Sequence, residues 1–176
     1  MIIAVGADHR GTVVLKTIAA AIEQQGFEIR YMGRRERAEA CDYPDVAYPV
    51  ARAVANGDAD RGILVCGSGI GMCIAANKVK GVRAALVHDE IGAEMSRRHN
   101  NANILCLAGD LLGIRILERI VNVWLCTGFD GGRHARRVAK ISAIEAGQEP
   151  DHEADATPAT TPAAPAAGAD SAGVAD

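Results

Sequence analysis

The stretch from Gly62 to Gly71 combines a thiol with three glycines at alternating positions. Residues 63–65 are apolar, as expected of a strand buried on both faces, and residues 72–78 have the pattern of a helix. The glycines let the backbone turn tightly, so that several amide N–H groups can face one cavity. Such donors favour the thiolate form of a nearby cysteine, which makes Cys66 a candidate reactive thiol. The stretch therefore predicts a loop that stabilises negative charge.

A second interpretation of this loop stays open at this point. Alternating glycines also occur in nucleotide-binding folds, and Asp89 follows about 20 residues on, as the acid of a dinucleotide site would. That fingerprint belongs to the first strand of its domain, however, whereas this loop follows the third predicted strand.

Other polar residues stand where strands or helices are expected to end. Asp8 and His9 follow the first predicted strand. Because the carboxyl ends of parallel strands meet at one edge, these two side chains and Cys66 are expected at the same edge. His99 and Asn100 follow a predicted helix, and periodicity alone favours a surface histidine at that helix end.

Arg133 and Arg137 lie four positions apart in a predicted helix, and so on one helical face. Two guanidinium groups at this spacing can bind phosphate oxygens bidentately. The alternative is a solvated helix face, which is the commoner arrangement for such a pair.

Strand and helix signals alternate along the chain, and this pattern predicts an α/β fold. The expected form is a doubly wound, five-stranded parallel sheet in a Rossmann-like three-layer sandwich. Thr12 is expected to cap the first helix and Asp89 the fourth. The predicted strands are 2–7, 28–32, 61–66, 82–87 and 103–108, and the predicted helices are 12–25, 44–56, 72–78, 89–98, 111–126 and 133–145.

The composition divides the chain into residues 1–146, one domain, and residues 147–176, an Ala-, Pro- and Asp-rich acidic tail expected to be disordered. The tail contains six acidic residues and no Lys or Arg, whereas the whole chain has a net charge of −3. Residues 1–146 are therefore mildly basic, which suits an anionic small molecule. Nucleic-acid binding is not expected, because a basic stripe with stacking aromatics is absent.

With no run of about 18 apolar residues and no signal peptide, the chain is expected to be cytoplasmic and not bound to a membrane. Five scattered cysteines without a C-x-x-C pair argue against a zinc site.

Six motifs, spread over roughly residues 2–144, resemble the type B ribose-5-phosphate isomerases. These enzymes form one family with the galactose-6-phosphate isomerase subunits. The motifs are Gly6-x-Asp8-His9-x-Gly11, Asp42-Tyr43-Pro44, Cys66-Gly-Ser-Gly-Ile-Gly71, Ala75-Ala76-Asn77-Lys78, Ser96-Arg-x-His99-Asn100 and Gly131-Gly-Arg-His134.

This resemblance implies an aldose–ketose isomerase of phosphorylated sugars that uses neither a metal nor another cofactor. Cys66 matches the base that moves a proton between C1 and C2 through a cis-enediolate, and His99 matches the residue that opens the furanose ring. Active sites shared between the subunits of a homodimer or homotetramer are also implied. The implied substrate ligands are the anion-hole residues Gly67, Ser68, Gly69, Ile70 and Gly71, the hydroxyl ligands Asp8 and Asn100, and the phosphate ligands His9, Arg133 and Arg137.

Asp110 departs from the family pattern, in which many members have a phosphate-binding arginine at this place. Asp110 is expected either near the phosphate or elsewhere, with Arg10 or Arg136 taking over the binding. The expected reaction converts D-ribose 5-phosphate to D-ribulose 5-phosphate. The alternatives are isomerisation of a hexose 6-phosphate or a tetrose 4-phosphate, or a non-catalytic sugar-phosphate-binding subunit. Intact Cys66 and His99 argue against the last alternative.

Overall fold

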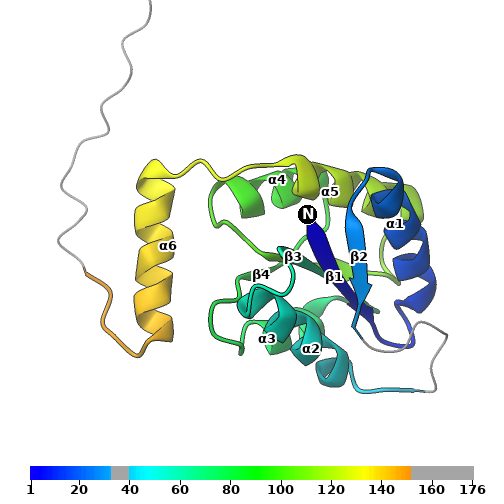
Figure 1. Cartoon of the computed structure of the whole chain (residues 1–176), viewed down its shortest axis with the longest axis horizontal. Helices are drawn as coiled ribbons and strands as arrows, with labels where there is room; N and C mark the ends of the chain where they lie inside the picture. Colours follow the sequence, from blue (N-terminus) through cyan, green and yellow to red (C-terminus); the bar gives the residue numbers. More distant parts are fainter. Residues whose placement is uncertain (33–39, 152–176) are drawn as a thin grey trace, which may run out of the picture.

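The computed structural model describes residues 1–32 and 40–151, and its fold matches the predicted class (Figure 1). Most of the predicted loop after Gly33 and the tail beyond Asp151 lie outside these residues, so the boundary at residue 146 stays a prediction. The elements are β1 (Ile2–Ala7), α1 (Thr12–Gln24), β2 (Glu28–Tyr31), α2 (Tyr43–Ala55), β3 (Arg61–Cys66), α3 (Ile70–Ala76), β4 (Ala84–Leu86), α4 (Glu90–Arg98), β5 (Ile104–Ala108), α5 (Ile114–Cys126) and α6 (Gly132–Glu145).

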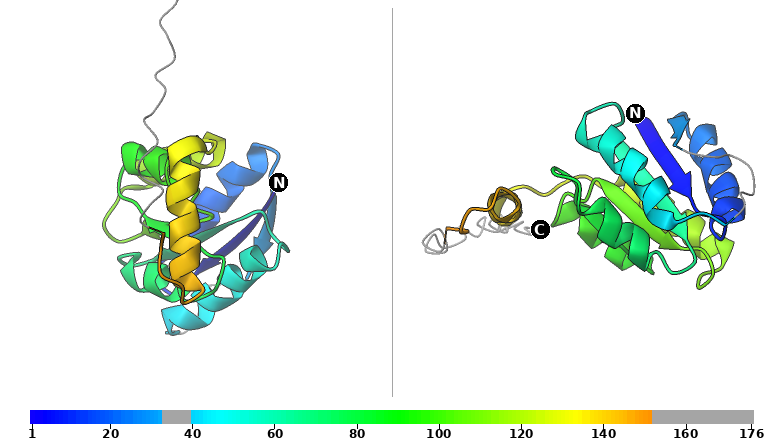
Figure 2. Two further views of the ribbon diagram at one scale, coloured as in Figure 1. Left: turned by 90° about the vertical axis from the view of Figure 1, so that its left-hand side faces the viewer. Right: turned by 90° about the horizontal axis from the view of Figure 1, so that it is seen from below.

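The five strands form one parallel sheet in the order β2-β1-β3-β5-β4. Side chains alternate across it: Ile3 and Val5 face the core beneath α1, α4 and α5, and Ala4 faces the core beneath α2 and α3. The sheet is therefore the middle of three layers, as Figures 1 and 2 show. This confirms the predicted doubly wound sandwich.

Several predicted boundaries were wrong by one to three residues, and the predicted cap of α1 was wrong as well. Thr12 is not the cap of α1 but its first helical residue, and Gly11 occupies the cap position. The hydroxyl of Thr12 donates instead to the carbonyl of Asp8 at 2.8 Å. The predicted cap of α4 is confirmed, because the carboxylate of Asp89 accepts from the amide of Gly92 at 2.6 Å.

The helix α6 stands beside the three-layer body rather than on the sheet (Figures 1 and 2). It meets the body near its two ends, where His134 stacks on His99 and Glu145 accepts from the amide of Gly81 at 2.9 Å. Its apolar residues Ile141 and Ile144 are exposed. No helix in the described ranges has the length and apolar character needed to cross a bilayer.

The loop between β1 and α1 approaches the end of β3 so closely that only glycine fits at position 11. A Cβ on Gly11 would lie 2.3 Å from the carbonyl oxygen of Val65. Because this neighbour is backbone in the middle strand of the sheet, it cannot move away cheaply. The loop that carries Asp8 is thereby held against the end of β3.

Gly11→Ala is expected to lower the free energy of unfolding by about 1–3 kcal/mol, the usual cost of overpacking a close-packed site. Urea denaturation at matched protein concentration measures it. Gly128→Ala is the control: a Cβ on Gly128 would meet nothing within 4 Å, so its effect should stay within about 0.5 kcal/mol. Equal stabilities for the two variants would contradict this close approach.

Candidate active site

One pocket at the carboxyl edge of the sheet contains several of the predicted residues, and we call it the Cys66 pocket. It has a volume of about 460 Å³ and lies at the ends of β1, β3 and β5, three neighbouring strands. The predicted meeting of Asp8 and Cys66 at one edge is confirmed. The lining residues are Asp8, Arg10, Tyr43, Cys66, Gly67, Ser68, Gly71, Asp110 and Leu111.

The glycine loop supplies amide donors beside the thiol. Gly69 has a φ of +74°, in the left-handed region that favours glycine, and its amide donates to Cys66 Sγ at 3.1 Å. Within the described residues the amides of Gly67 and Ser68 meet no acceptor. Because an unpaired N–H in a partly buried loop is costly, these two donors are suited to an anionic ligand.

The carboxylate of Asp8 holds the neighbouring loop in shape. It is buried and accepts from the amides of Arg10, at 2.9 Å, and Gly11, at 3.1 Å. His9, the next residue, is not among those lining the Cys66 pocket, and its Nδ1 accepts from the amide of Cys41 at 3.5 Å. The structure thus brings Asp8, but not the ring of His9, to the wall of this pocket.

Sequence reasoning assigned no role to Tyr43, which also lines the pocket. A Cβ on Gly71 would lie 2.6 Å from the tyrosine ring, so the ring packs directly on the glycine loop. The glycine at position 71 was the only sequence signal for this contact. A glycine indicates that another group packs closely against the backbone, but it does not identify that group as Tyr43.

Asp110 lies in the Cys66 pocket, where it pairs with Arg10. The Nε of Arg10 donates to Asp110 Oδ2 at 2.5 Å. Asp110 was expected near the phosphate, or elsewhere with Arg10 or Arg136 taking over the binding; the structure places Asp110 and Arg10 together in one pocket and so matches neither alternative alone.

A second group of predicted residues surrounds His99 at the end of α4, and we call His99, Asp130, Arg133, His134 and Arg137 the His99 cluster. The rings of His99 and His134 stack with centroids 4.1 Å apart. Burial, and then the charge of His99, lower the pKa of His134. Paired with Arg98, Asp130 has a pKa below its usual range. His134 is buried, and its ring packs against that of His99.

Within one chain the Cys66 pocket and the His99 cluster lie at opposite ends of the sheet. Cys66 stands opposite Ala108 at the carboxyl end of β5, and Gly62 stands opposite Ile104 at its start. His99 follows α4 and leads back to this start of β5. The start of β5, near His99, and its carboxyl end, near Cys66, are four residues of strand apart, which is roughly 13 Å. This separation is far beyond hydrogen-bonding reach.

The other predicted residues of this region divide between α4 and α6. Asn100 lines a small pocket of about 240 Å³ together with Ser96 and Ile141, away from Cys66. Arg133 and Arg137 lie in the first turns of α6, beside His134. None of these three predicted ligands lines the Cys66 pocket of its own chain.

His99, Asp130 and His134 also form a set whose ligand atoms lie within 4.8 Å of one another, as a divalent cation would need. The two rings are inclined by only 2°, however, so their nitrogen lone pairs run parallel and do not converge on one ion. Arg133 Nε donates to His134 Nε2 at 3.4 Å, and Arg98 Nε donates to both oxygens of Asp130. This arrangement suits hydrogen bonding better than metal binding.

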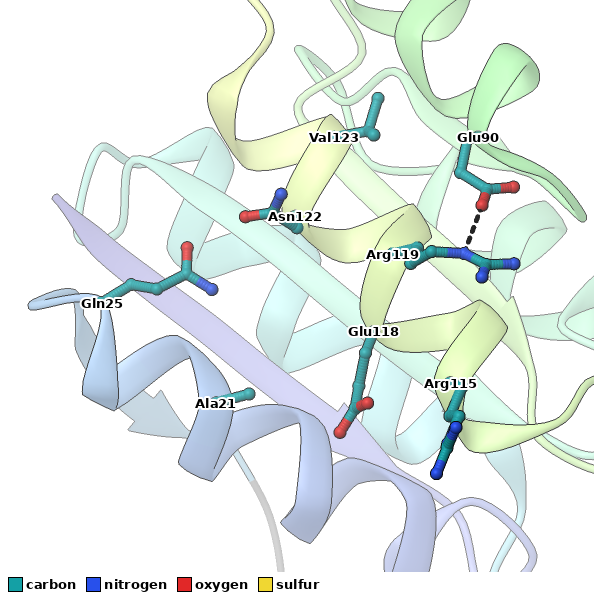
Figure 3. Close-up of a pocket in the computed structure, with 8 residues that line it drawn as sticks. All are labelled: Ala21, Gln25, Glu90, Arg115, Glu118, Arg119, Asn122 and Val123. Atoms are coloured by element: carbon teal, nitrogen blue, oxygen red, sulfur yellow. Dashed lines mark hydrogen bonds and ion pairs between the residues drawn. The ribbon is translucent and has the colours of Figure 1, made fainter.

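A larger pocket, of about 810 Å³, lies between α1 and α5 and contains none of the predicted site residues (Figure 3). Its charged groups partly satisfy one another, since Arg119 Nε donates to Glu90 Oε1 at 2.6 Å. Lacking a thiol, a histidine or a glycine-rich loop, it offers less chemistry than the Cys66 pocket. The residues lining it are Ala21, Gln25, Glu90, Arg115, Glu118, Arg119, Asn122 and Val123.

Known proteins resemble this chain over most of its length. Ribose-5-phosphate isomerase B of Escherichia coli is 42% identical over 143 residues, which cover 81% of this chain and 95% of that protein. D-erythrulose-4-phosphate isomerase of Pectobacterium atrosepticum is 41% identical over 143 residues, which cover 81% and 94%.

A solved structure agrees with these relatives. Ribose-5-phosphate isomerase B of Clostridium thermocellum superposes with a TM-score of 0.82 at 46% identity, over 84% of this chain and 99% of that one. The family model described as Ribose/Galactose Isomerase matches residues 3–141, a range that includes both the Cys66 pocket and the His99 cluster. The chain therefore belongs to the ribose/galactose isomerase family.

Proposed function

We propose that this protein interconverts a phosphorylated aldose and ketose, namely D-ribose 5-phosphate and D-ribulose 5-phosphate. The observation that carries the proposal is the position of Cys66 Sγ, 3.1 Å from the amide of Gly69 and beside the unpaired amides of Gly67 and Ser68. A base next to free donors is the arrangement that an enediolate intermediate requires.

In the proposed reaction the Cys66 thiolate takes the proton from C2 of the open-chain aldose. The C2–H electron pair forms the C1–C2 double bond, and the C1 carbonyl electrons move to O1, which becomes the enediolate oxygen. The amides of Gly67 and Ser68 stabilise this oxygen. The O2 hydroxyl proton moves to O1, and as the O2 electrons form the C2 carbonyl the C1–C2 double bond takes the thiol proton at C1, which gives the ketose and restores the thiolate. Loss of one donor of this kind typically lowers kcat by about 10²–10³.

We further propose that two subunits share each active site. The His99 cluster is too far from Cys66 to act in its own chain, and α6 extends from the body with exposed Ile141 and Ile144. A helix with an uncovered apolar face is a natural contact for a second copy. In the proposed homodimer, His99 of one subunit opens the sugar ring in the other subunit's Cys66 pocket. Asn100, Arg133 and Arg137 accompany it as sugar and phosphate ligands.

The length of the sugar is the least constrained part of the proposal. A relative named for ribose 5-phosphate and one named for erythrulose 4-phosphate have nearly the same identity to this chain. The Arg10–Asp110 pair lies in the Cys66 pocket and departs from the family pattern, and the second of these relatives makes a tetrose 4-phosphate the second candidate substrate.

The test is turnover of a panel of aldose phosphates with four, five and six carbons, followed by proton NMR of the purified protein with each sugar. Ribose 5-phosphate should give ribulose 5-phosphate with the highest kcat/KM. A higher kcat/KM for the tetrose phosphate would identify that sugar as the substrate and leave the proposed isomerisation mechanism unchanged. Binding of a sugar phosphate without turnover of any would refute the proposed function and support the non-catalytic subunit.

A further inference from the structure

Arg10 has a distinctive place in the Cys66 pocket. Among the described residues that line this pocket it is the only one with a positive charge, and the pocket also contains the carboxylates of Asp8 and Asp110. A phosphorylated sugar carries a dianion, which needs a cation or several hydrogen-bond donors where it binds. Arg10 is the one lining side chain that meets this need from the subunit that carries Cys66.

Asp110 holds Arg10 in a defined position. Oδ2 of the aspartate accepts from the Nε of Arg10, and among the described residues no acceptor is bound to the Nη groups of Arg10. These terminal groups are the fork that binds phosphate oxygens bidentately. The pair also rests on the glycine loop, because a Cβ on Gly67 would lie 2.5 Å from Asp110 Oδ2 and 2.9 Å from Arg10 Nε. The guanidinium is therefore fixed beside the residue that follows Cys66.

We infer that Arg10 binds the substrate phosphate in the Cys66 pocket, that Asp110 is its positioning residue, and that the pair sets the length of sugar accepted. The inference rests on the proposed function, because it takes the ligand to be a sugar phosphate. A guanidinium fixed beside Gly67 sets the distance from phosphate to Cys66. With the phosphate held there, the C1 and C2 atoms of a sugar one carbon longer would lie beyond the Cys66 thiol. Those of a sugar one carbon shorter would not reach it.

Arg10→Gln is the direct test. It is expected to raise KM roughly tenfold to a hundredfold, the value of a charge-assisted hydrogen bond. The change in kcat should be small, because phosphate binding is similar in the ground and transition states. Unchanged KM, or a fall in kcat at constant KM, would overturn the inference.

Asp110→Asn tests the positioning role separately, because the amide keeps the shape of the carboxylate and removes its charge. The freed Arg10 should bind phosphate in several places, so KM should rise and the ratio of kcat/KM between four- and five-carbon substrates should move toward one. A lower KM with an unchanged ratio would show that Asp110 only repels the phosphate, and would overturn its role as a positioning residue.

A matched control exists on another part of the surface. Arg119 and Glu90 form an ion pair of nearly the same length and exposure as Arg10 and Asp110 (Figure 3). Arg119→Gln should therefore leave KM and the chain-length ratio as in the wild type. An equal rise in KM for Arg119→Gln and Arg10→Gln would mean that the loss of surface charge alone is responsible, and would overturn the inference.

Titration calorimetry with inorganic phosphate separates this inference from the proposed function, because it requires no turnover. The wild-type protein should bind phosphate, and Arg10→Gln should weaken that binding by the same factor as KM. If the sugar panel shows no turnover but Arg10→Gln still weakens phosphate binding, the proposed reaction fails and the phosphate site stands. If the sugars are isomerised but phosphate binds both proteins equally, the Arg10 inference fails and the reaction stands.

Discussion

Cys66→Ala is expected to lower kcat for the preferred sugar phosphate by about a thousandfold or more, within the range attributed to general acid–base catalysis. Alanine removes the proton acceptor and leaves the amides of Gly67 and Ser68 in place, so KM and the melting temperature should change little. Steady-state kinetics and thermal unfolding of the same preparation measure both quantities. Turnover within about tenfold of the wild type would rule out Cys66 as the base.

Cys73→Ala is the matched control for this experiment. A hydrogen bond with Cys106 lowers the pKa of Cys73 to about 7, which favours the thiolate form of this second thiol near neutral pH. It does not line the Cys66 pocket. Wild-type kcat for Cys73→Ala, beside the loss in Cys66→Ala, would show that position in the pocket decides which thiol is the base.

The shared active site predicts a recovery of activity when two inactive variants are combined. Cys66→Ala and His99→Asn should each be nearly inactive on cyclic substrates. When the two are denatured and refolded together, a mixed dimer contains one site with both substitutions and one site with both native residues. With random pairing, an equimolar mixture should regain about a quarter of the wild-type activity.

The controls for the mixing experiment are each variant refolded alone and a mixture of Cys66→Ala with the Cys66→Ala/His99→Asn double variant. None of these can assemble a site with both native residues, so all should stay inactive. A mixture of the two single variants that gains nothing, although tagged subunits prove that mixed dimers form, would contradict the shared site.

Most of the fold could be predicted because its signals are local. Apolar runs such as residues 63–65 mark strands buried on both faces, and Asp89 caps its helix as expected. The cap of α1 was predicted at Thr12 but lies at Gly11, because a contact distant in sequence decides it: Gly11 must fit against the backbone of Val65. The start of α5 was also missed, since the apolar Leu111 has a helical pattern but lines the Cys66 pocket instead.

The candidate site was predictable in composition and less so in arrangement. The carboxyl ends of parallel strands lie at the same edge of the sheet, so the sequence alone could place Asp8 and Cys66 together. His99 follows a helix that runs back across the sheet, and its motif does not reveal which subunit's pocket it serves. The pair of Arg10 with Asp110 joins residues 100 positions apart, a contact that no local pattern encodes.

The most direct test of the central claim is proton NMR of ribose 5-phosphate in deuterium oxide with the wild-type protein and with Cys66→Ala. The wild type should form ribulose 5-phosphate and introduce solvent deuterium at the carbon that receives the proton, because an enediolate exchanges protons through its base. Cys66→Ala should bind the sugar phosphate, yet neither form product nor introduce deuterium. Product formation or deuterium incorporation by Cys66→Ala at the wild-type rate would contradict the claim that Cys66 is the base of a sugar-phosphate isomerase.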